Sequence, residues 1–126
     1  MVDGFFLNIR DLPAVKVPVV FGETVSSPDF ILDTGFSGDI KVDTQTANDL
    51  GIDLNDAAIT YIGNATGQRV PARLAHGFAE LEGKKKPMNI IVADGPHLVG
   101  ISFLSAFGYT AVVDCKNWEC YLESSR

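Results

Sequence analysis

Apolar positions along the chain come in short runs that glycine and proline separate. β-Branched and aromatic residues are frequent in these runs, and several runs alternate apolar with polar positions. The runs cover residues 5–9, 15–21, 30–32, 70–78, 89–93, 111–113 and 118–122. Many short strands at nearly regular spacing are typical of an all-β sandwich or barrel, and we therefore expect an all-β protein.

Two stretches have a helical pattern instead. Residues 44–50 predict a short helix that Thr44 caps, because its hydroxyl can accept from a free backbone N–H, and that Gly51 ends. Residues 102–107 have a similar pattern, with Ser102 as the expected cap. The all-β fold should thus contain one or two short helices.

Composition limits the class of protein. The 126 residues are enough for one small domain, and no shift in composition divides residues 1–126 into two. The formal net charge of −6 gives no electrostatic support for binding nucleic acid. No apolar run approaches the roughly 20 residues needed to cross a bilayer. Residues 1–4 lack the basic segment of a secretory signal, so we expect a cytoplasmic protein without a membrane partner.

Several common chemistries have no support in the sequence. Two cysteines, Cys115 and Cys120, are too few for a disulfide framework or a zinc site, and we expect reduced thiols. His76 and His97 belong to no cluster with metal-ligand spacing, so surface or hydrogen-bonded roles are expected for them. Neither a Gly-x-Ser-x-Gly frame nor a phosphate-binding loop occurs. We therefore expect no metal and no cofactor.

The most informative stretch is residues 31–38, Ile-Leu-Asp-Thr-Gly-Phe-Ser-Gly. An apolar strand leads directly into Asp33, which fixes the carboxylate at the end of the strand. Gly35 allows a sharp turn, and the Thr34 hydroxyl can hold the loop through local hydrogen bonds. The simpler interpretation is a turn that Asp initiates between two strands, since Asp and Gly are common turn residues.

With these motifs the chain resembles the retropepsin-like (retroviral-type) aspartic proteases, and in particular their cellular, non-viral branch, over roughly residues 15 to 122. In that family a strand ends in Asp-Thr-Gly, and a further strand, a short helix and a Leu-Gly step follow. A second signature places two apolar residues and Gly before another short helix. The matching segments here are residues 33–38, 39–42, 44–48, Leu50-Gly51, Leu98-Val99-Gly100, 112–114 and 118–122.

The resemblance implies a closed retropepsin-like β-barrel and an aspartic-type endopeptidase, with Asp33 as the catalytic residue. It implies that the first motif forms the active-site loop and that the second packs beneath it and holds Asp33 in place. Thr34 would brace this loop against the same loop of a second chain, and Gly35 would present its carbonyl to substrate. Ser37 would form a hydrogen bond either with the substrate backbone or only within its own turn. The active-site loop comprises Thr34, Gly35, Phe36 and Ser37, and its support comprises Leu98, Val99 and Gly100.

One carboxylate is not enough for this reaction. One group must deprotonate a water while a second, protonated group donates to the scissile carbonyl, so the pair shares a proton; the aspartic proteases are the standard example of this arrangement. The chain has one Asp-Thr-Gly and no room for a second lobe. We therefore expect a homodimer, in which the second Asp33 comes from an identical chain across a two-fold axis.

The resemblance also implies a flap hairpin, placed at about residues 60–69, that covers the substrate. The substrate would be an extended peptide or unfolded protein, bound by strand pairing. The expected flap residues are Ile62, Gly63, Asn64, Ala65, Thr66 and Gly67. Two alternatives remain: a catalytically inactive, protease-like dimerisation or peptide-binding module, and a small-ligand β-barrel, which would need an internal cavity.

Overall fold

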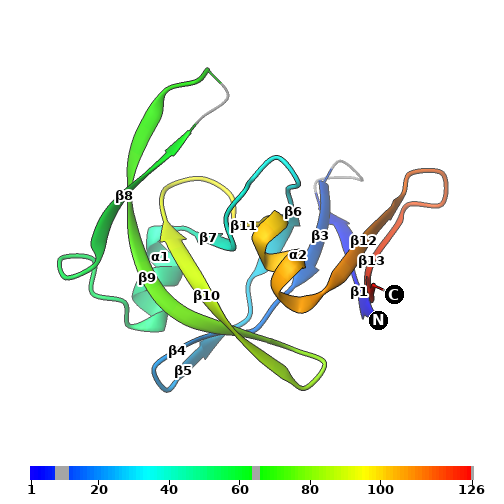
Figure 1. Cartoon of the computed structure of the whole chain (residues 1–126), viewed down its shortest axis with the longest axis horizontal. Coiled ribbons are helices and arrows are strands. Elements are labelled where there is room, and N and C mark those ends of the chain that lie inside the picture. The colour runs from blue at the N-terminus through cyan, green and yellow to red at the C-terminus, as the bar shows by residue number, and fades with distance from the viewer. Residues whose placement is uncertain (8–11, 64–65, 126) are drawn as a thin grey trace.

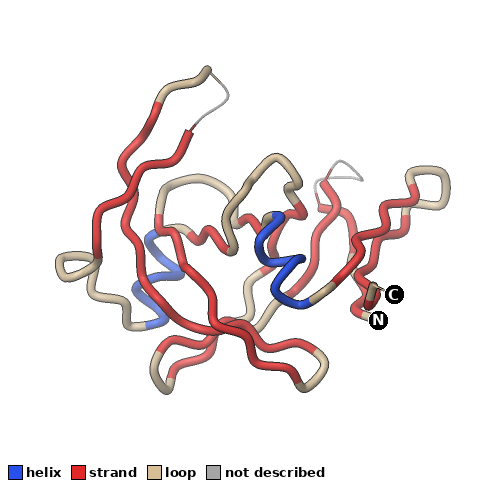
Figure 2. Tube along the Cα trace, in the orientation of Figure 1, coloured by secondary structure: helices blue, strands red, loops and turns tan. Residues whose placement is uncertain are grey.

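The computed structural model describes residues 1–7, 12–63 and 66–125. Within these ranges the chain is mostly β-strand, with two short helices (Figure 2). The strands are β1 (Val2–Asp3), β2 (Phe5–Leu7), β3 (Leu12–Lys16), β4 (Val19–Phe21), β5 (Thr24–Ser26), β6 (Asp29–Leu32), β7 (Ile40–Val42), β8 (Ala58–Gly63), β9 (Arg69–Leu81), β10 (Lys84–Val92), β11 (Leu98–Val99), β12 (Tyr109–Asp114) and β13 (Glu119–Ser124). The helices are α1 (Thr44–Leu50) and α2 (Ile101–Phe107).

Most strands belong to one large sheet that curls into a half-barrel (Figure 1). Its strand order is β2-β3-β6-β11-β7-β10-β9-β4-β5, and β8 pairs with β9 outside this path. The all-β prediction with short helices is confirmed. The closed barrel is not confirmed, because the path of the described strands begins at β2 and ends at β5.

A second sheet has the order β1-β13-β12 and brings the two ends of the chain together. Val2 pairs with Leu122 in antiparallel register, so the N- and C-terminal strands lie side by side (Figure 1). Neither α1 nor α2, the two helices in the described ranges, has the length and apolar character needed to cross a membrane.

Alternation along the strands builds the core. In the second half of β9, buried Ala75, Ala79 and Leu81 alternate with exposed His76 and Glu80, as expected for a strand with one face against the core. The helices each add a large apolar side chain to the same cluster. The largest fully buried side chains are Phe30, Phe103, Ile40, Leu50, Ile90 and Leu122.

The first predicted helix is confirmed, but its cap is a different residue. Helix α1 spans Thr44–Leu50 and ends at Gly51, whose φ of 81° is the left-handed conformation that glycine tolerates. The cap is Asp43, whose carboxylate accepts from the Thr46 N–H at 2.8 Å. Thr44 was the wrong cap because the helix already includes it, and the preceding Asp has the extended backbone that capping requires.

The second helix begins one residue before its predicted start. Helix α2 spans Ile101–Phe107, with Gly100 at the cap position and no side-chain cap. Ser102 lies inside the helix, and its hydroxyl donates to the Ser37 carbonyl at 2.6 Å. The cap prediction failed because a tertiary contact engages this hydroxyl.

The run predicted at residues 15–21 is two strands. Pro18, which has no N–H to donate, separates β3 from β4. Strand β3 pairs with β6, whereas β4 pairs with β9, so the chain changes its neighbour at this break. The N-terminal run was predicted over residues 5–9; residues 5–7 form β2, and residues 8–9 lie outside the described ranges.

Gly77 lies where β9 passes close to β4 and provides a test of the packing. A Cβ at this position would be 2.5 Å from the Val20 carbonyl oxygen and 2.8 Å from the Ile90 side chain. We expect Gly77→Ala to lower the free energy of unfolding by about 1–3 kcal/mol. The control is Gly63→Ala, because a Cβ at this position would meet nothing within 4 Å. This variant should change the free energy of unfolding by less than about 0.5 kcal/mol. Urea unfolding of both variants checks this, and equal stabilities would contradict the packing described.

Candidate active site

Asp33 follows directly after β6, and backbone contacts hold it on both sides. Its N–H donates to the Val99 carbonyl at 3.0 Å, and its own carbonyl accepts from the Phe36 N–H at 3.0 Å. The Asp33 carboxylate accepts from the Gly35 N–H at 2.9 Å. Asp33 is half-buried at the end of the strand. The hydrogen bonds of the tight turn fix the direction of its side chain.

Strand β11 is the support of this turn. It is parallel to β6, with Val99 opposite Leu32, and antiparallel to β7, with Val99 opposite Ile40. Val99 is 1% exposed, so its side chain is anchored in the core while its carbonyl receives the Asp33 N–H. The structure thus brings together the two motifs that lie more than 60 residues apart in the sequence.

Gly100 is buried beneath the loop of residues 33–39. Its N–H donates to the Asp39 carbonyl at 3.1 Å, and the next N–H, of Ile101, donates to the Phe36 carbonyl at 3.0 Å. A Cβ on Gly100 would collide with the carbonyl oxygens of Phe36 and Gly38. Only glycine therefore lets the start of α2 approach the loop of residues 33–39 this closely.

The remaining loop residues differ in exposure. Thr34, Gly35 and Ser37 are exposed, whereas Phe36 is half-buried. A Cβ on Gly38 would be 2.6 Å from the Phe36 ring, so this ring lies directly over the Gly38 backbone. Within the described ranges the Thr34 hydroxyl forms no hydrogen bond, so the expected local lock of the loop is supplied by the Asp33–Gly35 contact instead.

The predicted flap is a long hairpin that projects from the body of the molecule (Figure 1). Strands β8 and β9 form it, with Ile62 opposite Val70 and Gly63 opposite Arg69. Thr66 and Gly67 follow in the turn. Asn64 and Ala65 lie outside the described residues.

Two cavities flank the segment of residues 93–97, which joins β10 to β11. The first, of about 500 Å³, lies under the flap hairpin. Its lining includes Ile59, Ile62, Val70, Arg73, Ala93 and Asp94. The second, of about 430 Å³, is lined by Leu7, Leu12, Asp29, Ile31, Asp43, Gly95, Pro96 and His97. Ile31 lies two residues before Asp33 on β6, so the second cavity is next to the strand that carries the carboxylate; Asp33 itself lines neither cavity.

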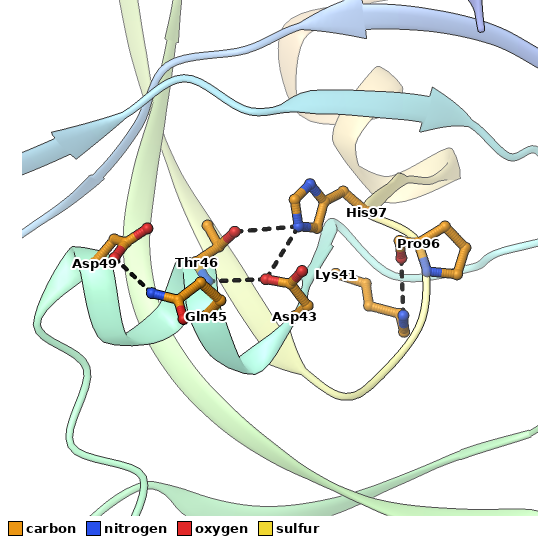
Figure 3. A network of polar contacts seen from close by, with 7 residues as sticks. All are labelled: Lys41, Asp43, Gln45, Thr46, Asp49, Pro96 and His97. Carbon is orange, nitrogen blue, oxygen red and sulfur yellow. Dashed lines mark hydrogen bonds and ion pairs between the residues drawn. The ribbon is translucent and has the colours of Figure 1, made fainter. Parts of the chain in front are cut away.

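A polar cluster beside these cavities was not predicted from the sequence. Asp43 accepts from Thr46, and its carboxylate lies 3.2 Å from the His97 ring Nε2, which is also 3.1 Å from the Thr46 hydroxyl (Figure 3). On the same strand-to-helix segment, the Lys41 ammonium donates to the Pro96 carbonyl at 2.8 Å. His97 therefore has a hydrogen-bonded role, one of the two that the sequence predicted for it. For the other members of the cluster, the sequence offered only the alternation of side chains along a strand, which places Lys41 and Asp43 on the same face.

Two pKa values in this cluster move for different reasons. The backbone N–H of Thr46 is the main cause that lowers the pKa of Asp43, and His97 adds to it. Burial lowers the pKa of Lys41, while the nearby Asp43 and Asp94 carboxylates oppose this effect. No group of His, Cys, Asp and Glu in the described part of the chain is arranged to hold a metal ion.

The protein has a retropepsin-like fold. It is similar to a retropepsin-like aspartic protease from Rickettsia conorii, with a TM-score of 0.69 and 20% identity over 97% of this chain and 90% of that one. It is also similar to the EIAV protease in complex with the inhibitor HBY-793, with a TM-score of 0.60 and 20% identity over 78% of this chain and 89% of that one. No protein-family model and no curated protein sequence matches.

The close approach at Gly100 can be tested by one methyl group. We expect Gly100→Ala to lower the free energy of unfolding by about 1–3 kcal/mol, since the Phe36 and Gly38 carbonyls must move. Ser102→Ala, which removes only one exposed hydrogen bond to the same loop, should cost about 1 kcal/mol or less. Thermal unfolding compares the stabilities of the two variants. A Gly100→Ala variant as stable as wild type would contradict the close approach described.

The cap at Asp43 should show in the pH dependence of stability. Because its pKa is lowered in the folded state, its contribution is complete above the unfolded pKa of about 3.9 and is lost as the pH falls through the lower, folded value. We expect Asp43→Ala to cost about 0.5–2 kcal/mol at pH 7, and the difference from wild type to shrink in acid. Urea unfolding from pH 7 to pH 3 measures this. Asp49→Ala, at the exposed far end of α1, is the control; a pH-independent difference for Asp43→Ala would refute the assignment.

Proposed function

We propose that the protein is an aspartic endopeptidase that acts as a homodimer, with Asp33 of each chain activating a water to hydrolyse a peptide bond. The main support is the geometry of Asp33 at the end of β6: its backbone N–H donates to the Val99 carbonyl, and its carboxylate accepts from the Gly35 N–H. A further support is the retropepsin-like fold, which the chain shares with two proteins that are named proteases. A carboxylate fixed in this way is preorganised to hold a water.

The proposal of a second chain is supported by two other acids that are already engaged, Asp39 next to the loop and Asp114 at the end of β12. Asp39 is engaged, since its carboxylate accepts from the Asn89 N–H at 2.7 Å. Asp114 accepts from the backbone of its own turn, at Lys116 and Asn117. Neither acid in the described ranges is placed as a partner for Asp33. A two-fold axis beside the exposed Thr34 and Gly35 would supply the missing carboxylate from an identical chain.

In the proposed dimer the two Asp33 carboxyls share one proton and titrate as a pair. The ionised group takes a proton from the water as the water attacks the scissile carbonyl, and the protonated group donates to the carbonyl oxygen. Thr34 braces the two loops across the axis, and the Gly35 carbonyl faces the substrate. Leu98, Val99 and Gly100 hold Asp33 from below.

The substrate in this proposal is an extended peptide or an unfolded protein segment. The β8–β9 hairpin would cover it, with Ile62, Gly63, Thr66 and Gly67 near the peptide; Asn64 and Ala65 remain part of the expected flap. Strand pairing supplies backbone hydrogen bonds, and the cavities on either side of residues 93–97 receive side chains.

Cleavage assays test the proposal directly. We expect wild-type protein to cleave a mixture of unfolded proteins, a statine-type transition-state mimic to inhibit it, and Asp33→Asn to lose at least about 10³-fold in rate. The matched control is Asp114→Asn, which should keep the wild-type rate because this acid serves its own turn. Absence of cleavage by wild type at any pH from acid to neutral would reject the enzyme in favour of a binding module.

Mixing experiments separate the dimer from the chemistry. If both carboxylates are needed, an equal amount of Asp33→Asn converts half of the wild-type chains into inactive mixed dimers, and the rate per wild-type chain falls to about one half. A rate that stays constant on mixing would show that each chain works alone.

A further inference from the structure

The segment of residues 93–97, which we call the 93–97 loop, is a wall shared by two cavities. Ala93 and Asp94 face the cavity under the flap hairpin, and Gly95, Pro96 and His97 face the cavity beside Ile31. The position of this loop therefore sets the shape of both cavities together. A residue that fixes the loop therefore acts on the shape of both cavities.

Backbone hydrogen bonds hold the two ends of this loop. The Ala93 N–H donates to the Val42 carbonyl at 3.1 Å, and the His97 carbonyl accepts from the Ile31 N–H at 2.9 Å. Between these ends the chain bends at Asp94-Gly95-Pro96, where Gly95 has a φ of 103°, open to glycine and strained for other residues. The middle of the loop needs a further contact if it is to keep one position.

Lys41 makes that contact. Its ammonium donates to the Pro96 carbonyl at 2.8 Å, and a Cβ on Gly95 would be 3.4 Å from the same nitrogen. The ammonium therefore lies inside the bend (Figure 3). Asp43, two residues further on, contacts the next loop residue through its carboxylate and the His97 ring at 3.2 Å. Two side chains on one face of the segment thus bind successive loop residues.

The cost of burying Lys41 argues that the ammonium serves the loop and not the stability of the fold. Lys41 is 6% exposed and lies between buried Ile40 and Val42. A buried charge is costly to desolvate, and an apolar side chain of similar size at such a site is often neutral or stabilising. A requirement for core stability alone would be met better by an apolar residue.

We propose that Lys41 is a positioning residue that fixes the 93–97 loop as the rigid wall between two substrate cavities and so determines how tightly the site holds a peptide. This inference rests on the proposed peptidase function for its kinetic consequence. The contact with Pro96 itself does not depend on that function. The two parts can therefore be tested separately.

The central variant is Lys41→Met, which keeps an unbranched apolar side chain one atom shorter and removes the ammonium. We expect it to unfold at the same or a higher urea concentration than wild type. Its KM for a peptide substrate should rise about fivefold or more while kcat stays within about twofold, which is the pattern of lost binding without lost chemistry. Lys41→Arg, which keeps a donor for the Pro96 carbonyl, should recover part of the affinity.

Hydrogen exchange gives a readout that needs no activity. Exchange of the Ala93 and Ile31 amides, whose hydrogen bonds hold the two ends of the loop, should become faster in Lys41→Met and not in Lys116→Met, a control at the exposed turn between β12 and β13. Faster exchange confined to these amides supports the proposal, even if wild type fails to cleave and the proposed function falls. Unchanged exchange, an unchanged KM in an active enzyme, or a matched loss of stability and kcat would overturn it.

Discussion

The backbone hydrogen bond from Asp33 to Val99 is the contact on which the site depends. It exists because β11, only two residues long, lies between β6 and β7 and pairs with both. Val99 anchors this strand in the core, and Gly100 then lets the chain turn into α2 without displacing the loop above it. A carboxylate at the end of a strand is therefore held by main-chain atoms, which move less than side chains.

A single chain with this arrangement has half of what peptide hydrolysis needs. Thr34 and Gly35 are exposed beside one carboxylate, while the Asp39 carboxylate accepts from the Asn89 N–H and that of Asp114 accepts within its own turn. The β8–β9 hairpin likewise projects from one side of the chain (Figure 1). The proposed two-fold axis would complete the catalytic pair and place a second hairpin over the same peptide.

The parts of this structure that the sequence predicts are those with local physical causes. Alternating apolar positions indicate strands, and Gly51 marks a helix end because few other residues adopt its backbone conformation. The Asp-Thr-Gly and Leu-Val-Gly motifs indicated the site together, through a resemblance that ties them to one fold. In the structure the two motifs are in contact, since the Asp33 N–H donates to the Val99 carbonyl.

What the sequence did not predict depends on strand register. Lys41 and Pro96 are 55 residues apart, and their contact exists only because Leu98 pairs with Lys41 across β11 and β7. Ser102 has the composition of a cap, yet its partner is a carbonyl 65 residues away. Asp43 and Thr44 are both good caps by residue type, and only the backbone conformation at position 43 distinguishes them.

The most direct test of the central claim is a crystal structure of the protein with a statine-type peptide. We predict two chains around one peptide, with an Asp33 carboxylate from each chain within hydrogen-bond distance of the same statine hydroxyl. One chain bound to one peptide, or a dimer whose Asp33 carboxylates face away from each other, would contradict the account.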